Sequence, residues 1–427
     1  MKVGLFLQGT PTDGVLPTGW LHRAQRWLHD AWADTLVASQ LHAADARGRP
    51  TLAFQLHPCA PDIEIAAVPG SRLEIRAETW QTGPGYHRHV EALLGATARE
   101  LAVAWHGPPD CADSQFDRRL SWPADPTVLE RLMLERLQQA STQALEQLRA
   151  GRVPAAFALP ETHGFDCPGA LCTPLGPRDA AWLRDVGRDP LRGTDAFAWW
   201  EPGRDARYKL GRALAMMWTA VRWRTPITDD ETSQWAQVLS LLREAHQEAP
   251  TLCFPWREWD ELRAFTDDRA PLPAHEPPPP SRPIGYRRRD VQVRPARQWT
   301  ITLPGSFAEL WDENGVYNAW AGGKTVTFAS LPVSAGEPPA SAEALLPELD
   351  PGETPLALPG LPAAFARRAG LSDLSSGGET LRRVSARIAL PGELVAVSVT
   401  FDDPSGLDWA IGTLESVRHR SVSASPG

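Results

Sequence analysis

Four consecutive prolines, Pro277 to Pro280, constrain the folding of this 427-residue chain more than any other feature. Proline fixes φ and lacks a backbone N–H, so this stretch can form neither a helix nor a central strand. We therefore predict that residues 269–297 are an extended linker. This linker separates a domain at 1–268 from a smaller one at 298–420, and residues 421–427 form a disordered tail.

Charge is distributed unevenly along the same division. Residues 269–297 hold seven basic and two acidic residues, whereas both flanking bodies are acidic and the whole chain carries a formal charge of −9. Nucleic-acid binding requires concentrated positive charge, so the balance argues against a nucleic-acid partner. The basic linker either packs against one of the acidic bodies or forms an anionic-ligand site around Arg287 to Arg289.

Cysteine use and hydropathy indicate the compartment. Five cysteines in a chain of this length do not form a disulfide framework, so we expect reduced thiols. The N-terminal apolar run has five residues, fewer than the roughly 7–15 of a secretory signal. No stretch approaches the roughly 20 apolar residues of a membrane span. We predict a cytoplasmic protein with no membrane partner.

Residue periodicity predicts an α+β fold. In the N-terminal domain we predict strands at 3–7, 51–57, 63–68, 72–80 and 153–159, and helices near 20–36, 86–101 and 127–150, with almost only helices from 177 to 267. Thr18 is the expected N-cap of the first helix. The domain is thus a mixed body with a sheet and a helical second half.

The C-terminal domain is expected to be an antiparallel sheet flanked by helices. A strand with Trp299 leads into a turn and a short helix, and Gly322 and Gly323 form the turn of a hairpin. Residues 341–370 are expected to be helix, loop and helix. Strands at 381–390 and 394–401 and a last helix follow, capped by Asp403 or Ser405.

Residues 299–418 carry the LPGSF turn at 303–307 and a closing helix that ends in SVR at 416–418. With this order of elements, the segment resembles PsbP-like α/β modules, which include the bacterial DcrB-like group. The resemblance implies a sheet with flanking helices and a binding or accessory role. The proline-rich insertion near 346–362 departs from the pattern.

Residues 199–224, WWEPGRDARYKLGRALAMMWTAVRWR, concentrate tryptophan and arginine. On a helical wheel, one apolar arc from 205 to 224 includes Trp218, which predicts a buried central helix. Tryptophan and arginine also dominate binding hot spots. The candidate binding residues are therefore Trp199, Trp200, Arg204, Trp223 and Arg224.

One further segment, THGFDCPGALC at 162–172, contains possible metal ligands in His163, Cys167 and Cys172. Their spacing matches no common zinc motif, and a structural loop is the simpler interpretation. The AGGKT segment at 321–325 lacks the first glycine of a phosphate-binding loop. We predict no cofactor.

We favour a non-enzymatic bacterial protein that binds another protein, such as a toxin-neutralising immunity protein or a secretion-system accessory factor. The acidic bodies suit a basic partner, because complementary charge accelerates association. The alternative is a metal-assisted hydrolase in the N-terminal domain, built from His163, Cys167 and Cys172 with help from His87.

Overall fold

The computed structural model describes residues 3–45, 48–107, 116, 120–154, 156–275, 282–296, 298–331, 341–376, 379–403 and 405–422. The four prolines, Cys111 and residues 423–427 of the predicted tail lie outside these ranges. The chain forms two compact units. The first comprises 1–160, 166–221 and 232–285, and the second comprises 161–165, 222–231 and 286–427.

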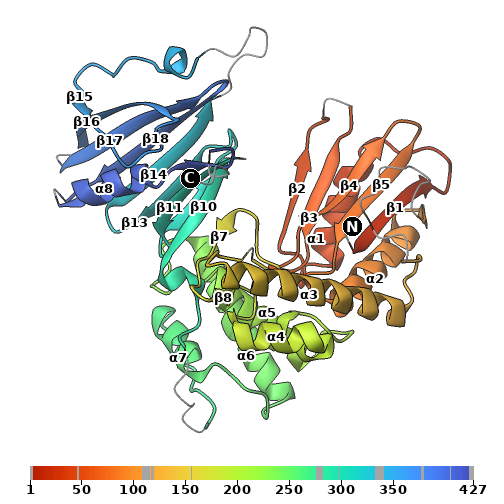
Figure 1. Cartoon of the computed structure of the whole chain (residues 1–427). Coiled ribbons are helices and arrows are strands. Elements are labelled where there is room, and N and C mark those ends of the chain that lie inside the picture. The colour runs from red at the N-terminus through yellow and green to blue at the C-terminus, as the bar shows by residue number, and fades with distance from the viewer. Residues whose placement is uncertain are drawn as a thin grey trace. The chain divides into compact units, whose positions relative to one another are not determined.

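The first unit combines an antiparallel sheet with helices, drawn from red to green in Figure 1. Its strands follow the order β2-β3-β4-β5-β1-β6. Their bounds are β1 (Gly4–Pro11), β2 (Ala38–His42), β3 (Thr51–Gln55), β4 (Ile63–Val68), β5 (Arg72–Glu78) and β6 (Val103–His106). A short pair, β8 (Ala170–Leu171) and β9 (Arg178–Asp179), forms a separate ribbon.

The helices of this unit contribute buried apolar residues to its core. They are α1 (Trp20–Ala31), α2 (Pro84–Glu100), α3 (Pro126–Arg149), α4 (Ala180–Arg188), η1 (Pro190–Ala196), α5 (Ala206–Thr219), α6 (Asp229–Glu248, whose first residues fall in the second unit) and α7 (Trp256–Phe265). Helices α1 and α2 share a core with the strands, and α3 shares another with α4 and η1. Trp218 is buried in α5, as the helical wheel predicts.

The second unit contains two antiparallel sheets, ordered β12-β13-β14-β18-β17-β16-β15 and β19-β11-β10-β7; β7 is drawn in yellow, and the strands from β10 onward run from cyan to blue (Figure 1). The strands are β7 (His163–Gly164), β10 (Asp290–Ala296), β11 (Trp299–Pro304), β12 (Ala308–Trp311), β13 (Tyr317–Ala321), β14 (Lys324–Leu331), β15 (Thr354–Leu356), β16 (Ala366–Ser376), β17 (Glu379–Leu390), β18 (Glu393–Phe401) and β19 (Arg418–His419). Helical segments are η2 (Tyr286–Arg288), η3 (Glu343–Leu345) and α8 (Gly406–Glu415).

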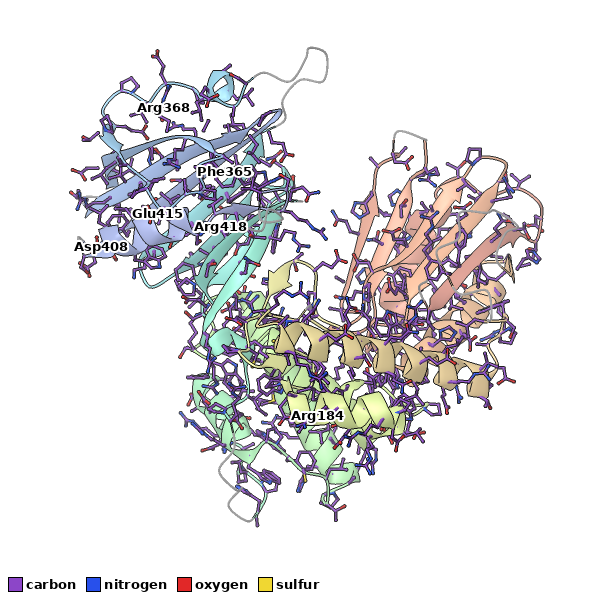
Figure 2. All side chains as sticks on the ribbon, in the orientation of Figure 1. Arg184, Phe365, Arg368, Asp408, Glu415 and Arg418 are labelled. Atoms are coloured by element: carbon purple, nitrogen blue, oxygen red, sulfur yellow. The ribbon has the colours of Figure 1, made fainter. Side chains whose placement is uncertain are left out.

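Helix α8 packs against β17, β18 and β11. Glu415, near its end, accepts a hydrogen bond of 2.6 Å from the backbone N–H of Gly360. The ring of Phe365 lies 5.4 Å from that of Trp299, so the loop before β16 is fixed at both ends (Figure 2).

The α+β fold with a C-terminal sheet domain agrees with the prediction, and so do the β13–β14 hairpin at Gly322 and Gly323 and the order β17, β18, α8. Other elements differ. The N-cap of α1 is Gly19 in a left-handed conformation, not Thr18. The described residues of 153–159 form no strand. Ser405 is the N-cap of α8 but makes no capping hydrogen bond with its side chain.

Strands β12 and β16 occupy segments for which we predicted helices. Residues 308–311, expected in a short helix, form β12, because a turn with Asp312 as hydrogen-bond acceptor returns the chain onto β13. The second helix expected in 341–370 is strand β16, whose pairing with β17 overrides the helix propensity of its alanines. Within residues 341–370, only the short η3 is helical. Glu353, in the same segment, accepts a hydrogen bond of 3.0 Å from Arg387 of β17.

Strand β10 lies within the segment predicted as a linker and is central in its sheet, between β11 and β7. Its proline, Pro295, coincides with a shift of register between Val293 and Ala296. A bulge is one of the few places where a strand accepts proline, since no ladder hydrogen bond is needed there.

Within the described residues, no helix combines the length and apolar character needed to cross a bilayer.

Candidate functional site

The most unusual residue of the first unit is Arg212, on the second turn of α5. Its side chain is almost fully buried, at 1% exposure. Its Nη1 donates to the hydroxyl of Tyr208 at 2.8 Å and to the backbone carbonyl of Asp34 at 3.4 Å. Its Nε is buried without a hydrogen-bond partner. Buried charges are normally paired, so a guanidinium held only by neutral oxygens among the described residues requires an explanation.

Arg212 lines a pocket of about 370 Å³ between α5 and α6. Two other cations, Arg204 and Lys209, line it as well. Each of them has a carboxylate partner: Arg204 pairs with Asp34, and Lys209 pairs with Glu244 at 3.1 Å. The remaining lining residues are Tyr208, Gln237, Ser240 and Leu241. Lys209 also pairs with Glu248, so Arg212, the most buried of the three cations, is the one without a carboxylate partner among the described residues.

Aromatic rings pack behind this pocket. Trp199, 2% exposed, lies 4.1 Å from Tyr208 and 4.7 Å from His89 between ring centroids. A second pocket of about 510 Å³ is lined by Trp199, Trp200, Tyr208, Leu210, Gly211 and Leu214, among others. We call the pocket lined by Arg204, Lys209 and Arg212 the basic pocket, and the one lined by Trp199 and Trp200 the aromatic pocket. Tyr208 lines both, so the two pockets adjoin on α5.

Two imidazoles near Arg212 are neutral at pH 7. Burial, followed by the Arg212 charge, lowers the pKa of His57 well below its ordinary value. Burial, followed by the Arg204 charge, lowers the pKa of His89 to about 4. His57 Nδ1 accepts a hydrogen bond from the Cys59 N–H at 3.2 Å. The positive charge at the site therefore resides on the guanidinium and ammonium groups alone.

The structure distributes the predicted binding residues between the two units. Trp199 is buried, Trp200 is partly buried in the aromatic pocket, and Arg204 stands at the basic pocket. Trp223 and Arg224 belong to the second unit. There the guanidinium carbon of Arg288 lies 3.7 Å from the centre of the Trp223 ring, and Arg224 donates two hydrogen bonds to Glu231.

Sequence reasoning missed Arg212, Tyr208 and Asp34. The helical wheel placed Arg212 outside the apolar arc, which is the ordinary position for an exposed arginine. A usable signal was the spacing of Tyr208 and Arg212, four residues apart on one face of α5. Burial of that face against α6 and the Asp34 loop depends on tertiary packing, which the wheel does not contain.

The candidate metal ligands have other partners. His163 Nε2 lies 2.9 Å from a Glu309 oxygen and 2.8 Å from Arg287 Nη2, so a guanidinium occupies the nitrogen that a metal would need. Cys167 and Cys172 are buried and form no disulfide with a described residue, and Cys167 Sγ lies 3.0 Å from Arg282 Nη1. Across the described part of the chain, no three His, Cys, Asp or Glu side chains converge as a metal site.

His87, the additional ligand of the hydrolase alternative, faces away from His89. Its Nδ1 lies 2.7 Å from the Thr79 hydroxyl, whereas His89 contacts the rings of Trp199 and Trp32. His87 and His89 are two residues apart on α2, so their imidazoles point to different sides of the helix.

Around Glu309, the second unit contains a buried ionic cluster. Glu309 accepts hydrogen bonds of 3.1 Å from both terminal nitrogens of Arg287, and Arg222 lies 3.8 Å away. Burial alone would raise the pKa of Glu309, but the Arg287 charge and the His163 hydrogen bond outweigh it and hold that pKa far below its ordinary value. The cluster joins three chain segments that are distant in sequence.

Comparisons with known proteins add little to this geometry. No protein-family model matches the chain, and no curated protein matches it. A crystal structure of a protein from Bacteroides thetaiotaomicron VPI-5482 is similar over 29% of this chain and 45% of that one, at 8% identity and a TM-score of 0.23. The chain thus spans less than half of that protein, and a likeness this weak carries no argument about fold or function.

Proposed function

We propose that this chain is a non-enzymatic protein that binds another protein, and that α5 and α6 of the first unit provide the contact. One observation carries the proposal: Tyr208 lines both a basic pocket and an aromatic pocket. Tyrosine, tryptophan and arginine are the residues that most often dominate protein-binding hot spots. Trp199, Trp200 and Arg204 fall in these two pockets.

Charge gives two different expectations for the partner. The formal charge of −9 favours a basic protein, whereas the pocket is positive around Arg204, Lys209 and Arg212. At physiological salt, charges beyond about 8 Å are largely screened. The local charge therefore decides what enters the pocket, and we propose that the partner presents an acidic group there.

The wider role that we propose is that of an immunity protein or a secretion-system accessory factor in a bacterial cytoplasm. The resemblance of residues 299–418 to PsbP-like modules supports an accessory role. The four cysteines described in the structure form no disulfide with a described residue, which supports a reducing compartment.

The test compares three forms of the intact protein as bait in the native host. These are the wild type, a pocket variant (Arg204→Glu with Lys209→Glu) and a control (Arg131→Glu with Arg192→Glu), whose arginines are exposed elsewhere on the first unit. We expect a partner that the wild type and control retain and that the pocket variant loses at least about tenfold.

The same partner, once purified, should bind the wild type and the control with equal affinity in calorimetry. Two results contradict the proposal: stringent washing leaves no reproducible partner, or the pocket variant retains the partner as well as the wild type does.

A further inference from the structure

The guanidinium of Arg212 uses only part of its hydrogen-bonding capacity. Both hydrogen bonds that the guanidinium makes to described residues come from Nη1, which donates to the Tyr208 hydroxyl and to the Asp34 carbonyl. Nε is buried without a partner, and Nη2 makes no hydrogen bond among the described residues. The Nε and Nη2 edge presents two parallel N–H groups, the arrangement that binds a carboxylate through two hydrogen bonds.

We infer that the α5–α6 pocket is a carboxylate-binding site whose deepest ligand-binding group is the Nε and Nη2 edge of Arg212. The inference rests on the proposed function and deepens it by naming the chemical group that the partner inserts. The pocket, of about 370 Å³, accommodates a carboxylate on a short chain. Tyr208 and the Asp34 carbonyl hold Nη1, so the guanidinium is fixed in place while its Nε has no partner.

Electrostatics favours a singly charged planar anion over a phosphate. Arg204 pairs with Asp34, and Lys209 pairs with Glu244 and Glu248, so Arg212 is the one cation of the pocket without a carboxylate partner among the described residues. His57 and His89 stay neutral and add no charge at pH 7. A phosphate dianion would exceed the available charge and would need donors beyond the single open edge.

The competing explanation is a structural arginine that fixes the Asp34 loop. The two explanations differ in what Arg212→Met does. A structural arginine stabilises the fold, so its loss should lower the unfolding midpoint. A buried charge that waits for its ligand is costly in the free protein, so methionine should leave the midpoint unchanged or raise it while abolishing carboxylate binding.

The experiment measures the thermal unfolding midpoint of the intact protein against increasing acetate, glutarate, a blocked glutamate tripeptide and inorganic phosphate, with chloride at equal ionic strength as the reference. A ligand that binds only the folded state raises the midpoint with concentration. We expect a saturable rise with the carboxylates, loss of the rise in Arg212→Met, and at least about tenfold weaker binding in Arg212→Lys.

The matched control is Arg243→Met, on α6 and outside the pocket lining, which should respond like the wild type. A stronger response to the tripeptide than to glutarate would assign a protein side chain as the carboxylate source, and the reverse would assign a free dicarboxylate. In the wild type, acetate should also shift the ¹⁵N resonance of Arg212 Nε, a readout that survives if Arg212→Met does not fold.

The inference is overturned if carboxylates act no more strongly than chloride, if phosphate alone acts, or if Arg212→Met keeps the response. These failures differ from failure of the proposed function. Pocket-dependent capture of a partner without any carboxylate response removes this inference alone. A carboxylate response without a captured partner removes the protein-binding proposal and leaves a small-molecule site.

Discussion

Glu309 has the most demanding electrostatic environment of any described carboxylate with a pKa shift. It is 3% exposed and contacts Arg287, His163 and Arg222. The neutral imidazole of His163 can form a hydrogen bond within this cluster in either of its two tautomers. With its proton on Nε2 it donates to Glu309, and with its proton on Nδ1 its Nε2 accepts from Arg287. The Thr162 hydroxyl, 3.0 Å from Nδ1, complements either tautomer.

Replacing this carboxylate should destabilise the protein strongly. In Glu309→Gln the volume is kept, but the negative charge facing Arg287 is lost, and breaking a buried pair costs about 3–5 kcal/mol. Urea unfolding of the wild type and the variant measures this loss. Glu313→Gln, in the exposed turn that follows β12, is the control and should change the free energy of unfolding by less than about 0.5 kcal/mol.

His89 makes a separate, pH-dependent contribution. The unfolded chain protonates this imidazole near pH 6.5, whereas the folded protein does so near pH 4. Between these values the unfolded state binds more protons, so the free energy of unfolding falls as the pH falls from 6.5 to about 4. The contribution is on the order of 3 kcal/mol, since the two pKa values differ by about 2.5 and one pKa unit corresponds to about 1.4 kcal/mol.

Chemical unfolding at a series of pH values tests this expectation. His89→Phe keeps a ring against Trp199 but cannot titrate, so its stability should depend less steeply on pH between 6.5 and 4. His22→Phe, on α1, is the matched control. An unchanged slope in His89→Phe would show that His89 does not titrate in this range.

At the level of single elements, the β13–β14 hairpin shows what a local pattern determines. Its two-residue turn requires positive φ at both positions, and Gly322 and Gly323 have φ values of 53° and 75°. The two glycines differ in their surroundings. A Cβ at Gly322 would meet open space, whereas a Cβ at Gly323 would overlap the carboxylate of Asp402.

This difference predicts unequal effects of substitution. Gly323→Ala combines an unfavourable φ with the Asp402 overlap and should cost about 1–3 kcal/mol. Gly322→Asn should be nearly neutral, because asparagine tolerates the left-handed region. Thermal unfolding of both variants decides the matter, and equal losses would contradict the role assigned to Asp402.

Elements with a strong local pattern follow the sequence closely. The stripe of leucines predicts α3 to within a residue, and alternation predicts β4, β17 and β18. The errors fall on segments such as β12 and β16, where pairing with a neighbouring strand determines the conformation. Local propensity has no access to that pairing.

At the scale of the whole molecule, the second unit is built from discontinuous chain. Residues 161–165 supply β7 and His163, and residues 222–231 supply Arg222, Arg224 and Glu231. Arg222 and Arg224 also donate to the backbone carbonyls of Phe307 and Ser306. The second unit therefore depends on residues that precede Pro277 by more than forty positions.

A fragment that begins at Tyr286 should accordingly be less stable than the same unit in the intact chain. It keeps Arg287 and Glu309 but lacks His163, Arg222 and Glu231, so the free energy of unfolding should fall by at least about 2 kcal/mol. Hydrogen exchange of the β17 and β18 amides, measured in both proteins, reports this difference. Equal protection would show that the two inserted segments add nothing.

The sequence by itself determined the α+β class, the principal helices, the main hairpins and the burial of Trp218, because each depends on periodicity or turn chemistry within about twenty residues. Composition also drew attention to Trp199, Trp200 and Arg204, which line the two pockets of the first unit. Only the tertiary structure shows that Arg212 is buried with its Nε unpartnered, that His163 contacts Glu309 and Arg287, and that β10 is part of a sheet. These outcomes depend on contacts between distant segments, and the free energy of burying a charge or pairing a strand is set by the neighbours that folding supplies.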